Sequence, residues 1–359
     1  MQEKKKKFLP FAPLRKRNGD EKMNFRTDLA LEVRENLEGS RIDGVECTSF
    51  ESAGAEITRL RVTDRRGEEI LGKPRGEYIT VQSQSFARSS RISDELIDAV
   101  AQELSRLLPS EGTVLAAGLG NTNITPDALG PKFIGGVFVT RHLKRELCEQ
   151  LGLGRLRPVA AIAPGVLGQT GVETGELLLG AVNVIKPCAV IVVDALAARK
   201  LGRLGSTVQI SDSGIIPGSG VGNSRAEISR KTLGVPVISV GVPTVVDAHT
   251  LARDVSGNNT NEPAEDAKMM VTPKEIDLLI ERCSGLLSLA VNRALQPELS
   301  IKDLIELTSL QIRLKLLQKC YNLIFLCNHF VFNCNRFVVA LAPCSVYTMY
   351  RRKEKLRNG

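Results

Sequence analysis

The chain has no tryptophan, and its aromatic residues make up only 4% of 359 residues. Proteins that hold single-stranded nucleic acid stack bases on aromatic side chains, so this class is disfavoured. Histidine is also scarce: His142 and His249 are the only two before residue 310. Neither has the spacing of a metal site. A histidine-based metal centre and a Ser-His-Asp triad are therefore poorly supported.

Cysteine is present, but its spacing excludes the sites that cysteines usually build. None of the cysteines before residue 310 lies in a Cys-x-x-Cys pair. A zinc site and a disulfide framework are therefore not predicted there, which suits a reducing cytoplasm. Half of the cysteines fall within the last fifty residues. In chain order the eight are Cys47, Cys148, Cys188, Cys283, Cys320, Cys327, Cys334 and Cys344.

The net charge of +8 is concentrated at the two ends of the chain. Residues 1–22 carry eight Lys and Arg against three acids, and residues 310–359 carry nine against one. The part between them is mildly acidic, so direct nucleic-acid binding is not predicted. The run Lys4–Lys7 has no apolar stretch after it, so it is not typical of a signal peptide. Residues 321–350 are apolar but interrupted by Arg336 and amides, and we expect no membrane span.

Composition divides the chain into three parts. Residues 1–28 are Lys- and Pro-rich at their start and are expected to form a disordered leader, with Met23 as an alternative start. Residues 29–309 are expected to form one domain. Residues 310–359 change character, and we interpret them as an atypical C-terminal extension.

Strand-like and helix-like segments alternate through the central part. Residues 55–83 have a strand–turn–strand pattern, which predicts a β-rich N-terminal elaboration. Thr272 and Pro273 have the pattern of a capping box that opens a long helix. Such alternation predicts an α/β fold with a mostly parallel sheet flanked by helices. The remaining expected strands are 113–117, 157–163, 189–193, 206–211 and 236–242, and the expected helices are 93–107, 141–151, 173–185 and 244–254.

Two acids stand in similar settings. Asp127 follows the apolar run Val114–Ala117 after a short loop, and Asp194 directly follows Ala189–Val193. Open α/β sheets place their chemistry past the carboxyl ends of such strands. Two carboxylates delivered to one crevice can share a proton and activate a water molecule. The alternative is that each aspartate caps a helix.

Glycine-rich segments supply further candidate site residues. The segment 214–225 contains Gly218, Gly220 and Gly222, but it matches neither the P-loop nor the dinucleotide fingerprint. It can bind phosphate or bring the backbone close to a substrate or to Asp212. Glu173, after a second glycine-rich turn, either joins the site or lies in the first turn of a helix. Asp127, Asp194 and Asp212 could also form an all-carboxylate metal site.

Together these segments resemble the germination protease family of spore-forming bacteria, over about residues 23–309. The matching segments follow the family's order. They are Arg26–Ala30, Gly118–Pro131, Thr140–Leu143, Pro164–Val166, Val193–Arg199, Gln209–Gly214, Pro217–Asn223 and Gly241–Ala248.

The resemblance implies an atypical aspartic endopeptidase with a fold similar to that of hydrogenase-maturation peptidases. Its catalytic acids fall on Asp127 and Asp194. It implies a zymogen that trims itself, a homotetramer, and small acid-soluble spore proteins as substrates in the cytoplasm of the spore core. Those substrates are cut in a Thr-Glu-Phe-Ala-Ser-Glu-like stretch. The segment Thr27–Glu32 imitates that stretch, so the resemblance places self-cleavage between Asp28 and Leu29.

We therefore expect an aspartic-type endopeptidase that needs no cofactor and no metal. Two alternatives stay open at this point. One is a metal-dependent hydrolase that uses the same carboxylates. The other is a non-enzymatic protein whose glycine loops hold a nucleotide.

Overall fold

The computed structural model describes residues 27–37, 42–84, 86, 92–150, 153–222, 225–248, 250–252 and 269–310. Most of the expected leader and nearly all of the expected extension, including residues 321–350, lie outside these ranges. The elements named below belong to one compact unit that ends at Thr308. Within the described ranges, no helix combines the length and the apolar character needed to cross a membrane.

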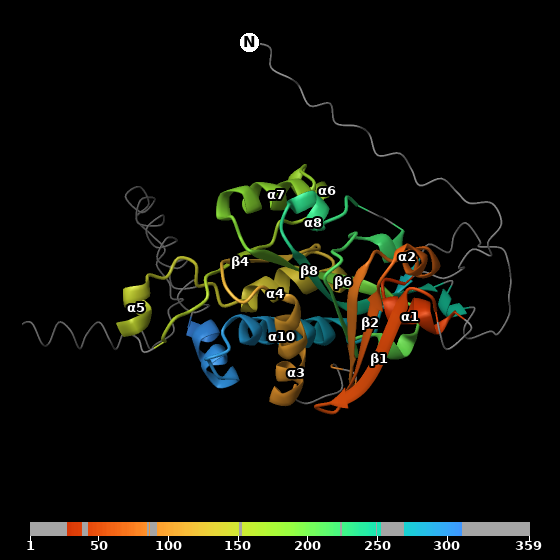
Figure 1. The fold of residues 1–359 in the computed structure, drawn as a ribbon, viewed down its shortest axis with the longest axis horizontal. Helices are drawn as coiled ribbons and strands as arrows, with labels where there is room; N and C mark the ends of the chain where they lie inside the picture. The colour runs from red at the N-terminus through yellow and green to blue at the C-terminus, as the bar shows by residue number, and fades with distance from the viewer. Residues whose placement is uncertain are drawn as a thin grey trace, which may run out of the picture. The chain divides into compact units, whose positions relative to one another are not determined.

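A nine-stranded mixed sheet forms the centre of this unit (Figure 1). Its main path runs β1-β2-β3-β7-β8-β6-β4-β5, with β9 added beside β8. In chain order the strands are β1 (Val45–Ser52), β2 (Ala55–Val62), β3 (Gly76–Gln82), β4 (Val114–Gly118), β5 (Val159–Ile162), β6 (Ala189–Ala198), β7 (Thr207–Ser211), β8 (Val237–Asp247) and β9 (Met270–Val271).

Parallel pairing is confined to the four neighbours β5, β4, β6 and β8. Every residue of β4 is buried, and β6 is buried at all positions except Ala195. Strands covered on both faces have such continuous apolar sequences. The remaining strands pair antiparallel, and β1 to β3 form the expected β-rich N-terminal part. The predicted α/β class with flanking helices is confirmed.

Helices cover both faces of the sheet (Figure 1). Helices α3 (Asp94–Leu107), α4 (Leu129–Gly136) and α10 (Ile276–Leu295) pack against one face in the largest apolar cluster. Helices α7 (Thr174–Ile185) and α8 (Arg230–Leu233) cover the other face. The shorter helices are α1 (Ala30–Glu35), α2 (Arg65–Leu71), α5 (Arg145–Gln150) and α6 (Leu167–Thr170), with 3₁₀ turns η1 (Thr125–Asp127), η2 (Leu201–Arg203) and η3 (Ser219–Val221).

Two local expectations were wrong. Strand β8 continues to Asp247, where a helix from residue 244 was expected, because residues 242–246 stay paired with β6 and β9. The Asp247 carboxylate accepts hydrogen bonds from the backbone N–H and hydroxyl of Thr250. The capping box is also absent. The Thr272 hydroxyl donates to the Thr244 carbonyl, and α10 begins later, at Ile276.

Candidate active site

Asp127 and Asp194 line the same pocket, and neither caps a helix. Asp194 lies within β6, not after it, because this strand runs five residues beyond the expected end at Val193. Asp127 ends η1, in the loop between β4 and α4. Strands β4 and β6 are parallel neighbours, so the residues that follow β4 lie beside β6. We call this cavity the acid pocket; it is also lined by Asp28, Leu119, Gly120, Pro126, Glu173, Leu196, Gly218, Arg225 and Thr244 among others.

The loop that carries Asp127 is fixed by close backbone contacts. The Asn121 N–H donates to the Asp127 carboxylate over 2.8 Å. A Cβ added at Gly120, where φ is +111°, would lie 2.0 Å from the Asp127 carbonyl oxygen. Asp127 is half-buried, and this burial raises its pKa, while the Asn121 N–H opposes that rise. Asp127 therefore has a fixed position and some access to solvent.

Asp194 is the more buried acid, with 6% of its surface exposed. Its Oδ1 accepts a hydrogen bond from the Ala195 N–H over 2.9 Å. Burial raises the pKa of Asp194 well above its usual range, and the charges of Asp127 and Asp28 raise it further. The pKa of Asp194 is therefore raised more than that of Asp127.

This raised pKa predicts how stability changes with pH. Between the unfolded pKa and the raised native pKa, the native state binds the extra proton, so stability falls as pH rises. Asp194→Asn removes this titration and keeps a similar shape. We expect the variant to match the wild type below about pH 4, the unfolded aspartate value. At neutral pH it should be more stable, by about 1.4 kcal/mol per pH unit between the two pKa values.

Urea unfolding between pH 4 and pH 8 measures this difference. Asp43 is an exposed acid at the start of the N-terminal β-rich part, and Asp43→Asn is the matched control. A wild type and an Asp194→Asn variant with the same pH dependence would contradict the assignment of the buried proton.

Asp28 also lines the acid pocket, and its carboxylate is held by two donors. One oxygen accepts from the Ala197 N–H over 2.8 Å, and the other accepts from the Ser219 hydroxyl over 2.7 Å. The Asp28 N–H donates in turn to the Ala197 carbonyl. A Cβ at Gly220 would lie 2.2 Å from an Asp28 oxygen, so only glycine leaves room for this contact. The site thus contains the residue at the expected cleavage point.

Glu32 is a second buried acid from the same segment, and no part of its surface is exposed. Its carboxylate accepts from the N–H groups of Arg199 and Lys200 over 2.7 and 2.9 Å. The Thr27 hydroxyl donates to it as well. Arg203 Nε lies 3.5 Å from Glu32 Oε1. Four residues apart, Asp28 and Glu32 are therefore both bound by the stretch that ends β6 and enters η2.

Of the other expected site residues, some line the acid pocket and some do not. Glu173 and Gly218 line the acid pocket, and Glu173 is the N-cap residue of α7. Gly220 contacts Asp28, as described above. Gly222 is the C-cap residue of η3, and the Asp212 carboxylate accepts from the Glu77 N–H over 2.7 Å. Neither residue lines the acid pocket.

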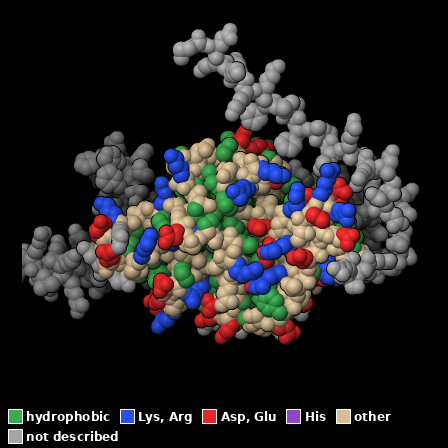
Figure 2. All heavy atoms as spheres, in the orientation of Figure 1, with side chains coloured by type: hydrophobic (Ala, Val, Ile, Leu, Met, Phe, Trp, Pro, Cys, Tyr) green, Lys and Arg blue, Asp and Glu red, His purple; other side chains and the backbone are tan. Residues whose placement is uncertain are grey.

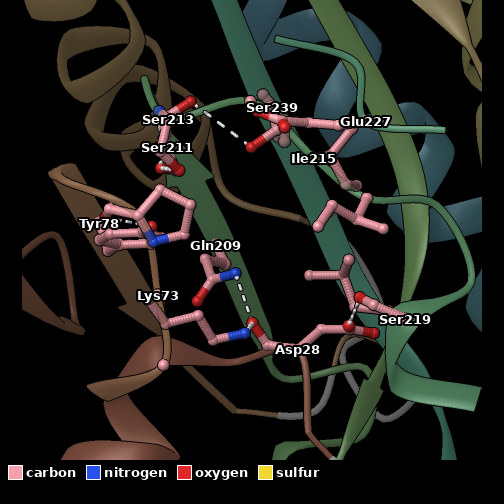
Figure 3. Close-up of a pocket in the computed structure, with 17 residues that line it drawn as sticks. Asp28, Lys73, Tyr78, Gln209, Ser211, Ser213, Ile215, Ser219, Glu227 and Ser239 are labelled. Carbon is pink, nitrogen blue, oxygen red and sulfur yellow. Dashed lines mark hydrogen bonds between the residues drawn. The ribbon is translucent and has the colours of Figure 1, made fainter. Parts of the chain in front are cut away.

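Two site residues had only weak signals in the sequence. Lys73 precedes a proline in a turn, and Gln209 lies in the middle of a buried strand. Both contact Asp28 in a second cavity, shown in Figure 3. A glutamine between two apolar residues of a buried strand was the one available hint, because buried polar groups need partners.

The structure also bears on the two alternatives. Within the described ranges, no group of three or more His, Cys, Asp or Glu side chains is arranged to hold a metal ion. The glycine loop at η3 directs Ser219 and Gly220 toward the Asp28 carboxylate. On the face seen in Figure 2, Lys and Arg side chains are interspersed with Asp and Glu.

Comparisons with known proteins identify the family. A family model described as "Germination protease" matches residues 24–257. The germination protease of Caldanaerobacter subterraneus is 42% identical in an alignment 319 positions long that covers 79% of this chain and 98% of that protein. That of Clostridium acetobutylicum is 44% identical in an alignment of the same length, which covers 78% of this chain and 97% of the relative.

Among solved structures, the [NiFe] hydrogenase maturation protease HycI from Thermococcus kodakarensis KOD1 matches with a TM-score of 0.30 and 17% identity. The match covers 53% of this chain and 98% of that one. The family assignment rests on the sequence relatives and confirms the resemblance stated above. The chain belongs to the germination protease family.

Proposed function

We propose that this protease is an aspartic endopeptidase in which Asp127 and Asp194 activate a water molecule. The observation that carries the proposal is the placement of both acids in one pocket, with Asp194 buried and its pKa raised partly by Asp127. Two carboxyl groups that share one proton can supply a base and an acid together. Asp127 acts as the general base on water, and Asp194 supplies the proton.

The substrates are small acid-soluble spore proteins, cut during germination in the cytoplasm of the spore core. Membership of the germination protease family supports this assignment. The acid-binding contacts around Asp28 agree with substrates that have an acidic residue before the cut bond. The homotetramer is supported by the family resemblance alone, and sedimentation equilibrium tests it.

A peptide assay tests the catalytic type. The purified full chain is incubated with a peptide that contains Thr-Glu-Phe-Ala-Ser-Glu, with and without a chelator, and the products are analysed by mass. Cleavage after the first glutamate that survives chelation supports the aspartic mechanism. Loss of cleavage with chelator, restored by a divalent ion, would favour a metal-dependent hydrolase. Nucleotide-dependent stabilisation without any cleavage would favour the binding protein.

Self-processing should be intramolecular. Asp28 already lies in the acid pocket of its own chain, so the bond to Leu29 needs no second molecule. We expect the first-order rate constant for loss of residues 1–28 to stay constant over a hundredfold range of protein concentration. Mass analysis over time measures this rate. A rate constant that rises in proportion to concentration would show that a neighbouring molecule performs the cut.

A further inference from the structure

The carbonyl oxygen of Asp28 has two side-chain donors of its own. Lys73 Nζ donates to it over 3.0 Å, and Gln209 Nε2 donates over 3.1 Å. Figure 3 shows both side chains directed at Asp28, Lys73 from the loop between α2 and β3 and Gln209 from β7. This carbonyl belongs to the bond that joins Asp28 to Leu29. The self-processing site therefore holds the atom that would become an oxyanion.

Gln209 also binds the backbone on the other side of the same bond. Its Oε1 accepts from the Ala30 N–H over 2.8 Å. One amide side chain therefore spans Asp28, Leu29 and Ala30. The Leu29 side chain is fully buried in an apolar cluster with Leu196, Ala198, Leu204 and Val246, which fixes the segment beyond the bond.

Lys73 carries its charge in a partly buried setting. The residue is half-buried and its ammonium group faces inward (Figure 3). Burial lowers the pKa of Lys73, while the charges of Asp28 and Glu32 oppose that change. A cation held away from water interacts more strongly with a developing negative charge than one in solvent.

Asp28 lines two cavities with different chemistry. One is the acid pocket, with Asp127 and Asp194. The other is the cavity of Figure 3, which we call the carbonyl pocket and which is lined by Lys73, Tyr78, Gln209 and others. Asp28 and Leu196 line both. The residue before the expected cleavage point thus borders both the pocket of the acid pair and the pocket of the two donors to its carbonyl oxygen.

We propose that Lys73 and Gln209 are catalytic residues that stabilise the oxyanion formed at the Asp28 carbonyl during self-processing. The inference rests on the proposed function. It separates two roles: the acid pair handles protons, and the carbonyl pocket binds the developing charge.

The reaction balances with these groups alone. Water adds its oxygen to the Asp28 carbonyl carbon and gives a proton to Asp127, while the carbonyl electron pair moves onto the oxygen. The Lys73 ammonium and the Gln209 amide donate hydrogen bonds to that oxyanion. When the tetrahedral species collapses, the bond to the Leu29 nitrogen breaks and this nitrogen takes the Asp194 proton. The products are an Asp28 carboxyl group and a free Leu29 amine.

The test measures the rate of self-cleavage in full-length variants. Lys73→Met removes the cation but keeps the length of the side chain. Gln209→Glu keeps the acceptor for Ala30 and removes the donor to Asp28. Removal of one oxyanion donor costs about 10²–10³-fold in rate, and we expect a loss of this size from each. Lys73→Arg, which retains a cation, should recover at least about tenfold over Lys73→Met.

Two controls separate catalysis from anchoring. Ser219→Ala also deletes one hydrogen bond to Asp28, but on its carboxylate, and should slow cleavage by less than about tenfold. Lys132→Met removes an exposed lysine on α4 that pairs with Glu281, and should change nothing. Thermal unfolding of the uncleaved proteins reports whether each variant is folded.

The outcomes are distinguishable. The proposed function fails if the wild type does not cleave itself. It also fails if the Asp194→Asn variant cleaves itself as fast as the wild type. If the wild type cleaves itself and folded Lys73→Met or Gln209→Glu stays within about threefold of it, the oxyanion assignment is overturned while the acid pair stands. Equal losses in Lys73→Met and Ser219→Ala would also overturn it. Both substitutions would then slow cleavage only because Asp28 is held less firmly.

Discussion

Asp127→Asn and Asp194→Asn should each abolish cleavage, and the double variant should be little worse than either single one. Both acids line one pocket, and the charge of Asp127 contributes to the raised pKa of Asp194. Groups that act as one catalytic unit are not additive, because losing one partner removes the function of the other. We expect losses of at least about 10³-fold in peptide cleavage for all three proteins.

Asp212→Asn is the matched control for this experiment. Asp212 is also an acid that follows a buried strand, but its carboxylate accepts from the Glu77 N–H and does not line the acid pocket. It should keep near-normal activity per folded molecule. A folded single variant at Asp127 or Asp194 with near-normal activity would remove that residue from the mechanism. Additive losses in the double variant would show that the two acids act separately.

Glu32→Ala should strongly destabilise the protein. The substitution leaves two N–H groups, of Arg199 and Lys200, without their acceptor. It also leaves Arg203, whose side chain is 7% exposed, without a buried counter-charge. Breaking a buried ion pair by removing one partner typically costs 3–5 kcal/mol. Urea unfolding should show a loss in this range.

Glu35→Ala is the control, one helical turn further along α1. Glu35 pairs with Lys200 and Arg203, but its side chain is 28% exposed. Ion pairs open to solvent contribute roughly 0–1 kcal/mol, so this variant should lose little. Equal losses from Glu32→Ala and Glu35→Ala would show that burial of Glu32 does not set the effect.

Local sequence patterns predicted most of the elements that surround the site. Strand β4 and helix α3 were expected within one residue at each end, and β6 from its correct first residue, because burial on both faces of a strand or on one face of a helix leaves a direct pattern in the sequence. The last five residues of β6 were missed. The end of β8 was missed because pairing with β6 overrides the local tendency of Pro243 and Thr244 to end a strand.

The contacts of Asp28 could not be predicted in the same way. Its partners Ala197, Gln209 and Ser219 lie at least 169 residues away in sequence. Lys73 has the local pattern of a turn residue, and only the pairing of β3 with β7 brings its loop beside Gln209. Spacing along one chain carries no signal for such long-range contacts. The family resemblance pointed to Asp28, but not to what binds it.

Much of the contact to the two acids of this segment is made by main-chain atoms. The N–H groups of Ala197, Arg199 and Lys200 would be present whatever side chains those positions carried. Substitutions at these three positions can therefore leave the hydrogen bonds to the two acids intact, provided that the new residue is not proline, which has no N–H. The path of the strand, whose register with β8 shifts between Leu196 and Ala197, places these donors, while the Ser219 hydroxyl and Arg203 add side-chain contacts. A relative of this chain could therefore bind the same two acids while sharing no residue at these three positions.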